Sequence, residues 1–87
     1  MAFKIVYRRD PVKVLRRVQP AKAGDITGAV ERIAADPSAP NHNVKPLRGI
    51  SNGFRVRVGD WRVSYTIDRE ALVIDVFEVA PRGGAYR

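Results

Sequence analysis

Arginines alternate with valines in the segment GFRVRVGDWRVSY, which spans residues 53–65. Arg55, Arg57 and Arg62 are the side chains in this segment that could do chemistry. A guanidinium group is planar and stays protonated in proteins, and its paired N–H donors match two oxygens of a phosphate. Three such groups on one rigid surface could hold a phosphate and stabilise negative charge that develops on it during a reaction.

Gly59 and Asp60 separate two runs of alternating apolar and polar residues, a pattern that predicts a β-hairpin closed by a type II′ turn. A two-residue loop fixes the register of the two strands. Arg57 is then predicted to lie directly opposite Arg62, with Arg55 two residues along the same face. The other face of the hairpin collects the apolar residues Phe54, Val56, Val58, Trp61, Val63 and Tyr65.

The predicted opposition of Arg57 and Arg62 destabilises the hairpin, because like charges across a strand pair repel on the ~0.2–1 kcal/mol scale of such pairs. Two interpretations are open. The guanidinium groups could splay into water, where salt screens them. The next strand, continued in register, would then place Phe77 opposite Arg62 and Asp75 opposite Ser64, where this carboxylate could pair with one arginine. Alternatively, the arginines form a preorganised anion site.

The C-terminal segment PRGGAYR carries a second candidate group. Arg82 follows the last predicted strand, and Tyr86 comes four residues later, beyond two glycines. A cation and an aromatic ring near a strand end could clamp a phosphate and stack a base. A frayed terminus is the alternative interpretation.

Other chemistry is restricted by residue counts. The chain has no cysteine, one histidine and no clustered carboxylate motif, so no metal site and no cofactor are expected. A two-histidine mechanism is excluded by count. His42 lies in the segment PNHNV and is expected to be a surface residue of a loop, with a catalytic role as the less favoured alternative. Asp60 is assigned to the hairpin turn, and Glu78 to local charge balance.

Periodicity and turn signals predict the elements that would position these residues. Asp10 is expected to cap a first helix with Pro11 at its first position, and Pro20 to separate it from a second helix. Residues 38–51 are expected to form a loop. The expected elements are a strand at 3–8, the two helices, the second at about 21–35, and strands at about 53–58, 61–67 and 71–79.

This order, β-α-α-β-β-β, predicts an α+β fold in which a helical hairpin packs on one face of an antiparallel sheet. The whole chain of 87 residues is expected to be a single domain, residues 1–87. The net charge of +7 favours a polyanionic partner. No apolar run approaches the ~20 residues of a membrane span, so a cytoplasmic protein without membrane contact is expected.

Two stretches together, VKPLRGISNGFRVRVGDWRVSYTID (residues 44–68) and PRGGAYR (residues 81–87), resemble the RelE/ParE toxin superfamily of type II toxin-antitoxin systems. The superfamily pattern is approximately Leu-[Lys/Arg]-Gly, a strand with alternating basic residues, Gly-Asp-[aromatic]-Arg-[Val/Leu]-x-Tyr, and a tail arginine with a tyrosine beyond it. The chain is most similar to the RelE-like branch, and the predicted order of elements agrees with that resemblance.

The RelE-like resemblance implies an endoribonuclease, or mRNA interferase, that cleaves mRNA in the ribosomal A site by metal-independent attack of a 2′-hydroxyl and so inhibits translation. It implies catalytic roles for Arg57, Arg62, Arg82 and Tyr86. It implies phosphate or RNA binding by Lys45, Arg48 and Arg55.

The implied roles divide the reaction among these residues. Arg57 and Arg62 would hold the scissile phosphate, Arg82 would lie near the leaving oxygen, and Tyr86 would stack the nucleotide. Many relatives have lysine at one or both of the positions of Arg55 and Arg57, and His or Lys where this chain has Pro81. Because arginine keeps its proton, the identity of the general base is left open.

The resemblance also implies partners: a cognate antitoxin protein, and the 70S ribosome with its mRNA, including contacts with 16S rRNA. No small-molecule cofactor is implied. Two alternatives remain. A ParE-like protein would keep the fold but inhibit DNA gyrase without nuclease activity, and an inactive member would only bind an antitoxin.

Overall fold

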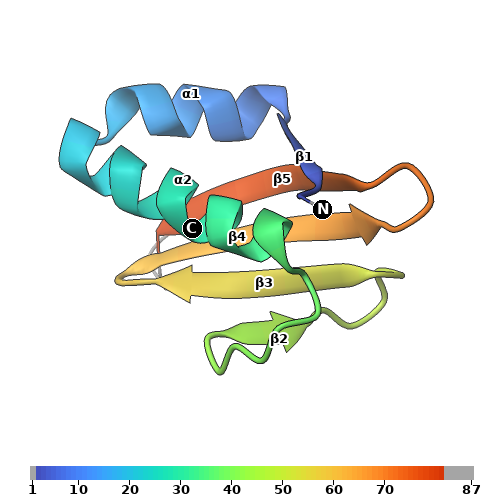
Figure 1. The fold of residues 1–87 in the computed structure, drawn as a ribbon. Coiled ribbons are helices and arrows are strands. Elements are labelled where there is room, and N and C mark those ends of the chain that lie inside the picture. Colours follow the sequence, from blue (N-terminus) through green and yellow to red (C-terminus); the bar gives the residue numbers. More distant parts are fainter. Residues whose placement is uncertain (1, 82–87) are drawn as a thin grey trace.

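The computed structural model describes residues 2–81 of the chain, and these form two helices and a five-stranded sheet (Figure 1). Both helices lie on the same face of the sheet and run antiparallel to each other. The α+β architecture with a helical pair on one face is therefore confirmed. The elements are β1 (Lys4–Tyr7), α1 (Arg9–Arg17), α2 (Pro20–Ala35), β2 (Val44–Pro46), β3 (Gly53–Val58), β4 (Trp61–Asp68) and β5 (Val73–Pro81).

The sheet has the order β1-β5-β4-β3-β2 and contains one parallel pair, β1 with β5. The expectation of a purely antiparallel sheet is therefore wrong for this pair, which joins the two ends of the chain. Strand β2 was also not predicted. It has only three residues, too few to show an alternation, and Pro46 can be accommodated because β2 is an edge strand.

The start of α1 differs from the prediction. Arg8, not Asp10, occupies the N-cap position, and its side chain makes no capping hydrogen bond. The backbone N–H of Arg8 donates to the carbonyl of Val76, and its own carbonyl accepts from Val12, so the chain passes directly from the sheet into the helix. Pro11 lies in the first turn and is buried, and Asp10 places a carboxylate near the positive end of the helix dipole.

The core lies between the helices and the sheet. Residues of α2 that recur at three- and four-residue steps are buried there, as the periodicity of the sequence predicts. Each fully buried valine or isoleucine contributes roughly 1.5–3 kcal/mol by leaving water. The side chains with at most 2% exposure include Ile26, Val30, Val56, Val63, Tyr65, Ile74 and Val76.

The hairpin of β3 and β4 has the predicted register. Val58 pairs with Trp61 and Arg57 with Arg62 across the strands. Gly59 has φ of +60°, the left-handed conformation that the first central residue of this turn requires. The loop therefore fixes the faces of both strands, because apolar residues turned toward the helices leave the arginines on the opposite face.

The pairing of β4 with β5 differs from the prediction. Glu78, not Asp75, lies opposite Ser64, and Ala80 lies opposite Arg62 in place of Phe77. The turn between the strands is longer than the sequence suggested, and a β-bulge between Ser64 and Tyr65 shifts the register further.

The long turn has a visible local cause. Asp68 Oδ1 accepts hydrogen bonds from the backbone N–H groups of Glu70 and Ala71, at 3.0 and 2.9 Å. Leu72 then adopts a φ of 59°, which reverses the chain one step before β5 begins at Val73. The side chain of Asp68 therefore delays the start of β5 beyond the expected residue 71.

Candidate functional site

The face of the sheet opposite the helices carries the candidate site, and we call it the arginine face. Cross-strand pairing aligns Lys45, Arg55, Ser64 and Glu78 in one row over β2, β3, β4 and β5. Arg57, Arg62 and Ala80 form the next row. The short strand β2 thus brings Lys45 beside the arginines of β3, an arrangement that follows from a pairing the sequence did not predict.

A polar network holds Arg55 in place. Arg55 Nε donates to Ser64 Oγ at 3.1 Å, and Arg55 Nη2 lies 3.3 Å from Glu78 Oε1. Ser64 Oγ donates to the same carboxylate oxygen at 2.9 Å, although Ser64 is fully buried. Because both contacts leave Arg55 little rotational freedom, its remaining N–H donors are preorganised on the arginine face.

Asp75 has a different partner from the one expected. It accepts two hydrogen bonds from Nε of Arg8, at 3.1 and 3.3 Å, and one from Nη2, at 2.9 Å. These hydrogen bonds, and then the charge of Asp75, raise the pKa of Arg8. The carboxylate that was expected to compensate the hairpin arginines therefore compensates a residue between β1 and α1, and Glu78 takes its place beside Arg55.

A cleft of about 490 Å³ opens on the arginine face. The described part of its lining contains three arginines, one lysine and no carboxylate. Such a concave surface with charge of one sign concentrates the field and attracts anions. Its lining residues are His42, Asn43, Lys45, Pro46, Leu47, Arg55, Arg57 and Arg62.

One wall of the cleft is the segment that leads into β2. The backbone N–H of Arg57 donates to the carbonyl of Asn43 at 3.0 Å, which extends the β2–β3 ladder past the end of β2. Asn41 closes the turn before it, since its side-chain oxygen accepts from the N–H of Asn43 at 2.9 Å and its carbonyl from Val44 at 3.0 Å. This wall is therefore built from fixed backbone rather than from a free loop.

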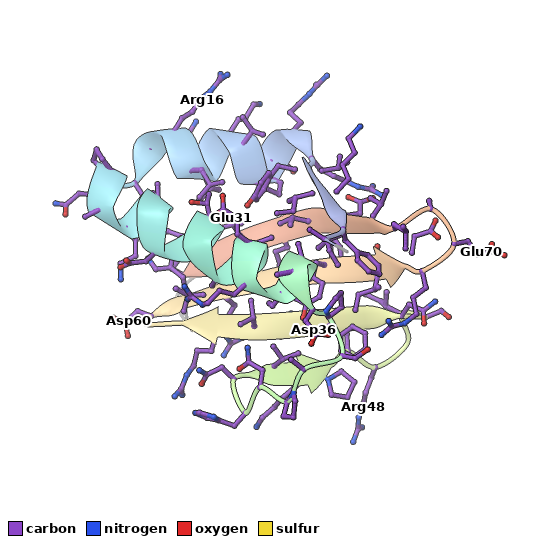
Figure 2. The ribbon with its side chains drawn as sticks, in the orientation of Figure 1. Arg16, Glu31, Asp36, Arg48, Asp60 and Glu70 are labelled. Atoms are coloured by element: carbon purple, nitrogen blue, oxygen red, sulfur yellow. The ribbon has the colours of Figure 1, made fainter. Side chains whose placement is uncertain are left out.

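The structure brings together Lys45, Arg55, Arg57 and Arg62, four of the residues singled out from the sequence. Arg48 is exposed and lies outside the lining, in the connection between β2 and β3 (Figure 2). Arg82 and Tyr86 lie outside the described residues. The cleft therefore gathers two of the three residues predicted to bind phosphate or RNA, Lys45 and Arg55, but not Arg48.

His42 is the residue whose position the sequence did not reveal. Its side chain is exposed, as expected of a loop residue, yet it lines the same cleft as the arginines. The signal that could have located it is the pairing of β2 with β3, since that pairing turns the segment PNHNV toward the arginine face.

The described residues contain neither a metal-binding cluster nor a membrane-spanning helix. Over residues 2–81, no three histidine, aspartate or glutamate side chains gather closely enough to hold a metal ion. In the same range, neither helix is both long and apolar enough to cross a membrane.

Comparison with known proteins gives one family. The family model described as "ParE toxin of type II toxin-antitoxin system, parDE" matches residues 5–86. A protein assigned as toxin RelE1 of Methanocaldococcus jannaschii is 25% identical over 88 residues, which cover 100% of this chain and 98% of that protein.

Two solved structures show the same fold. The archaeal RelE-RelB complex from Pyrococcus horikoshii contains a chain with a TM-score of 0.81 and 26% identity, matched over 98% of this chain and 100% of that one. The isolated E. coli RelE toxin gives a TM-score of 0.80 at 16% identity, over 98% of this chain and 89% of that one. The second likeness, at this low identity, shows the fold alone.

Proposed function

The chain belongs to the ParE toxin family of type II toxin-antitoxin systems, within the RelE/ParE superfamily, and from this premise we propose that it is a ribosome-dependent endoribonuclease. The observation that carries the proposal is the cleft on the arginine face, where three arginines and Lys45 converge and no carboxylate lines the described wall. The planar guanidinium groups match the paired oxygens of a phosphate, and their convergence supports this proposal.

The cleavage of RNA without a metal requires negative charge to be stabilised on the reacting phosphate. The 2′-oxygen attacks phosphorus while the bond to the 5′-oxygen breaks, and charge accumulates on the non-bridging oxygens. Arg57 and Arg62, adjacent across the hairpin, are assigned to those oxygens. Arg55, held by Ser64 and Glu78, is assigned to the neighbouring phosphate.

Two residues that follow β5 in the sequence complete this proposal. Arg82 is assigned to the leaving 5′-oxygen, and Tyr86 to stacking that orients the 2′-hydroxyl in line with the bond that breaks. Both assignments come from the family resemblance. Pro81, the last described residue, pairs with Trp61 beside the hairpin turn, one position beyond the pair of Arg62 with Ala80.

We assign the protein two kinds of partner. The first is the mRNA-programmed ribosome, with contacts to 16S rRNA. The second is a cognate antitoxin, because the similar P. horikoshii toxin was crystallised as a RelE-RelB complex. A peptide that carries carboxylates into the arginine face would neutralise the charges that phosphate otherwise meets. Such an assembly belongs in the cytoplasm.

A reconstituted translation reaction tests the activity. We expect purified protein to cut mRNA at codon positions only when ribosomes are present. Arg82→Ala and Tyr86→Ala should each lower single-turnover cleavage at least ~30-fold, equivalent to ~2 kcal/mol of transition-state stabilisation. Arg16→Ala, which removes an exposed charge from α1, is the matched control and should cleave normally. Unchanged cleavage by both tail variants would refute their assignment.

The second candidate function is inhibition of DNA gyrase, which is favoured by the match to a ParE family model. It is separated from the first by assaying supercoiling and mRNA integrity with the same protein preparation. Inhibited supercoiling with intact mRNA on ribosomes would replace the nuclease proposal with the gyrase one. Neither effect, in a protein that still binds an antitoxin, would indicate an inactive member.

A further inference from the structure

The cleft on the arginine face has several groups that can stabilise charge but few that can take up a proton. Arginine remains protonated in proteins and is a poor general base. Glu78, the carboxylate that contacts Arg55, is bonded to Ser64 Oγ and does not line the cleft. Attack by a 2′-hydroxyl nevertheless requires a group that accepts its proton.

Among the basic side chains of the described lining, His42 and Lys45 are the two that can give up a proton and become neutral. Imidazole is the side-chain type that gains and loses a proton between about pH 5 and 8, whereas an ordinary lysine stays protonated until well above that range. His42 is therefore the lining residue whose chemistry suits proton transfer near neutral pH.

The position of His42 is fixed by the backbone on either side of it. The turn at Asn41 and the hydrogen bond from Arg57 N–H to the Asn43 carbonyl enclose it between two anchored residues. That second hydrogen bond joins the residue after His42 to the backbone of Arg57, and both His42 and Arg57 line the cleft.

We propose that His42 is a catalytic residue of this cleft, the general base for the 2′-hydroxyl. The inference rests on the proposed endoribonuclease function. The 2′-O–H bond breaks as its proton passes to neutral imidazole, the 2′-oxygen bonds to phosphorus, and the bond from phosphorus to the 5′-oxygen breaks. The 5′-oxygen takes a proton from water, and the imidazolium then returns its proton to solvent, so the products are a 2′,3′-cyclic phosphate and a 5′-hydroxyl.

The charged groups that line the cleft with His42 come from three strands. On β2 there is Lys45, on β3 there are Arg55 and Arg57, and on β4 there is Arg62. Glu78 on β5 lies behind Arg55 and is bonded to it. These cations hold the phosphate next to the imidazole, so the base and the charge-stabilising groups act on the same nucleotide.

The test is single-turnover cleavage of mRNA on programmed ribosomes at a series of pH values. For the wild type we expect the rate to rise with pH, because a general base acts in its unprotonated form. His42→Gln should lower the rate ~100-fold or more and abolish that rise, with affinity for the ribosome changed less than twofold. His42→Ala should regain activity when free imidazole is added, which a merely structural role would not allow.

Because His42 is exposed, both variants should fold like the wild type, and Arg16→Gln on α1 serves as the charge-changing control. A His42→Gln protein that cleaves within threefold of the wild type and keeps the pH dependence would overturn the inference but leave the endoribonuclease function standing. Loss of the pH dependence in Lys45→Arg alone would transfer the role to Lys45. Absence of ribosome-dependent cleavage by the wild type would refute both proposals together.

Discussion

The protein has two basic regions of similar charge and very different construction, the arginine face and the outer surface of α1. Four exposed cations, Arg9, Lys13, Arg16 and Arg17, project from α1. Among the described residues, none of these four makes a side-chain hydrogen bond or ion pair. On the arginine face, by contrast, Arg55 is bonded to Ser64 and Glu78, and neighbouring cations line a cleft.

This difference suggests separate roles for the two regions, one in attracting a polyanion and the other in positioning it. Both regions add to the long-range field that draws a polyanion toward the protein. The side chains of α1 reach into water, as Arg16 does at the upper edge of Figure 2, and would lose rotational entropy on binding. The arginine face has already lost part of that freedom on folding. We infer that charge on α1 affects encounter and charge on the arginine face affects chemistry.

The largest expected effect on cleavage comes from removing arginines of the arginine face. The Arg57→Ala and Arg62→Ala variants should each lower single-turnover cleavage of ribosome-bound mRNA ~100-fold, because each removes a donor to the charge of the transition state. The Lys13→Ala and Arg16→Ala variants should change that rate less than threefold. If the α1 variants lost as much activity as the arginine-face variants, the distinction between the two regions would be wrong.

The next prediction tests the support beneath the arginine face. Tyr65 lies on the opposite side of β4 from Arg62 and Ser64, is 2% exposed, and burial raises its pKa to about 12. The unfolded chain has the ordinary tyrosine pKa of ~10. Between these values only the unfolded state loses the proton, so the free energy of unfolding should fall by roughly 1.4 kcal/mol per pH unit as the pH rises from 10 to 12.

Urea unfolding at pH 9.5 and 11.5 measures this loss, with Tyr65→Phe as the comparison. The phenylalanine variant cannot ionise at this position and should lose less stability than the wild type. Some alkaline sensitivity should remain in it, because burial, and secondarily the charge of Glu31, also raises the pKa of Tyr7. Equal losses in the two proteins would show that Tyr65 is not held as its burial implies.

A pair of glycine variants compares the strand beneath the cleft with the helical hairpin. A Cβ added at Gly53, the first residue of β3, would lie 2.6 Å from Ile50 Cγ2 and 3.1 Å from the Ile50 carbonyl oxygen. Gly53→Ala should therefore lower the free energy of unfolding by roughly 1–3 kcal/mol.

The matched variant has open space. At Gly24 in α2, an added Cβ meets nothing within 4 Å, so Gly24→Ala should stabilise the protein by roughly 0.5–1 kcal/mol through helix propensity. Chemical denaturation of both proteins checks the opposite signs. A neutral Gly53→Ala would mean that the Ile50 turn yields easily and does not fix the start of β3.

A further small effect is expected from changes at Glu78. Replacing it with alanine leaves the fully buried Ser64 hydroxyl without its acceptor and removes one of the two side-chain partners of Arg55, which should destabilise the fold by ~1 kcal/mol. Glu78→Gln keeps an acceptor oxygen and should cost less than half as much. Equal destabilisation by the two substitutions would show that charge, and not the hydrogen bond to Ser64, is what matters there.

The sequence predicted the parts of this fold that depend on short-range rules. The two-residue loop at Gly59 fixed the hairpin, so the opposition of Arg57 and Arg62 could be derived from the sequence and is confirmed. The buried face of α2 followed from its spacing in the same way. Both results need only the loop length and the period of the apolar residues.

The remaining parts depend on contacts between distant segments or on side chains in turns. The hydrogen bonds of Asp68 and the bulge at Ser64 place Glu78, instead of Asp75, opposite Ser64 and beside Arg55. Pairing of the three-residue strand β2 placed both Lys45 and His42 at the cleft. No local pattern encodes these pairings, so the composition of the cleft could be predicted only in part.

Site-specific photo-crosslinking on programmed ribosomes tests the central claim most directly, that the arginine face and not α1 receives the mRNA. A photoreactive benzoyl-phenylalanine would replace Leu47, which lines the cleft, or Lys13 on α1. We expect the Leu47 substitution to crosslink to mRNA at the A-site codon and the Lys13 substitution to leave the mRNA unmodified. Crosslinking of mRNA from Lys13 alone, or from neither position, would contradict the account.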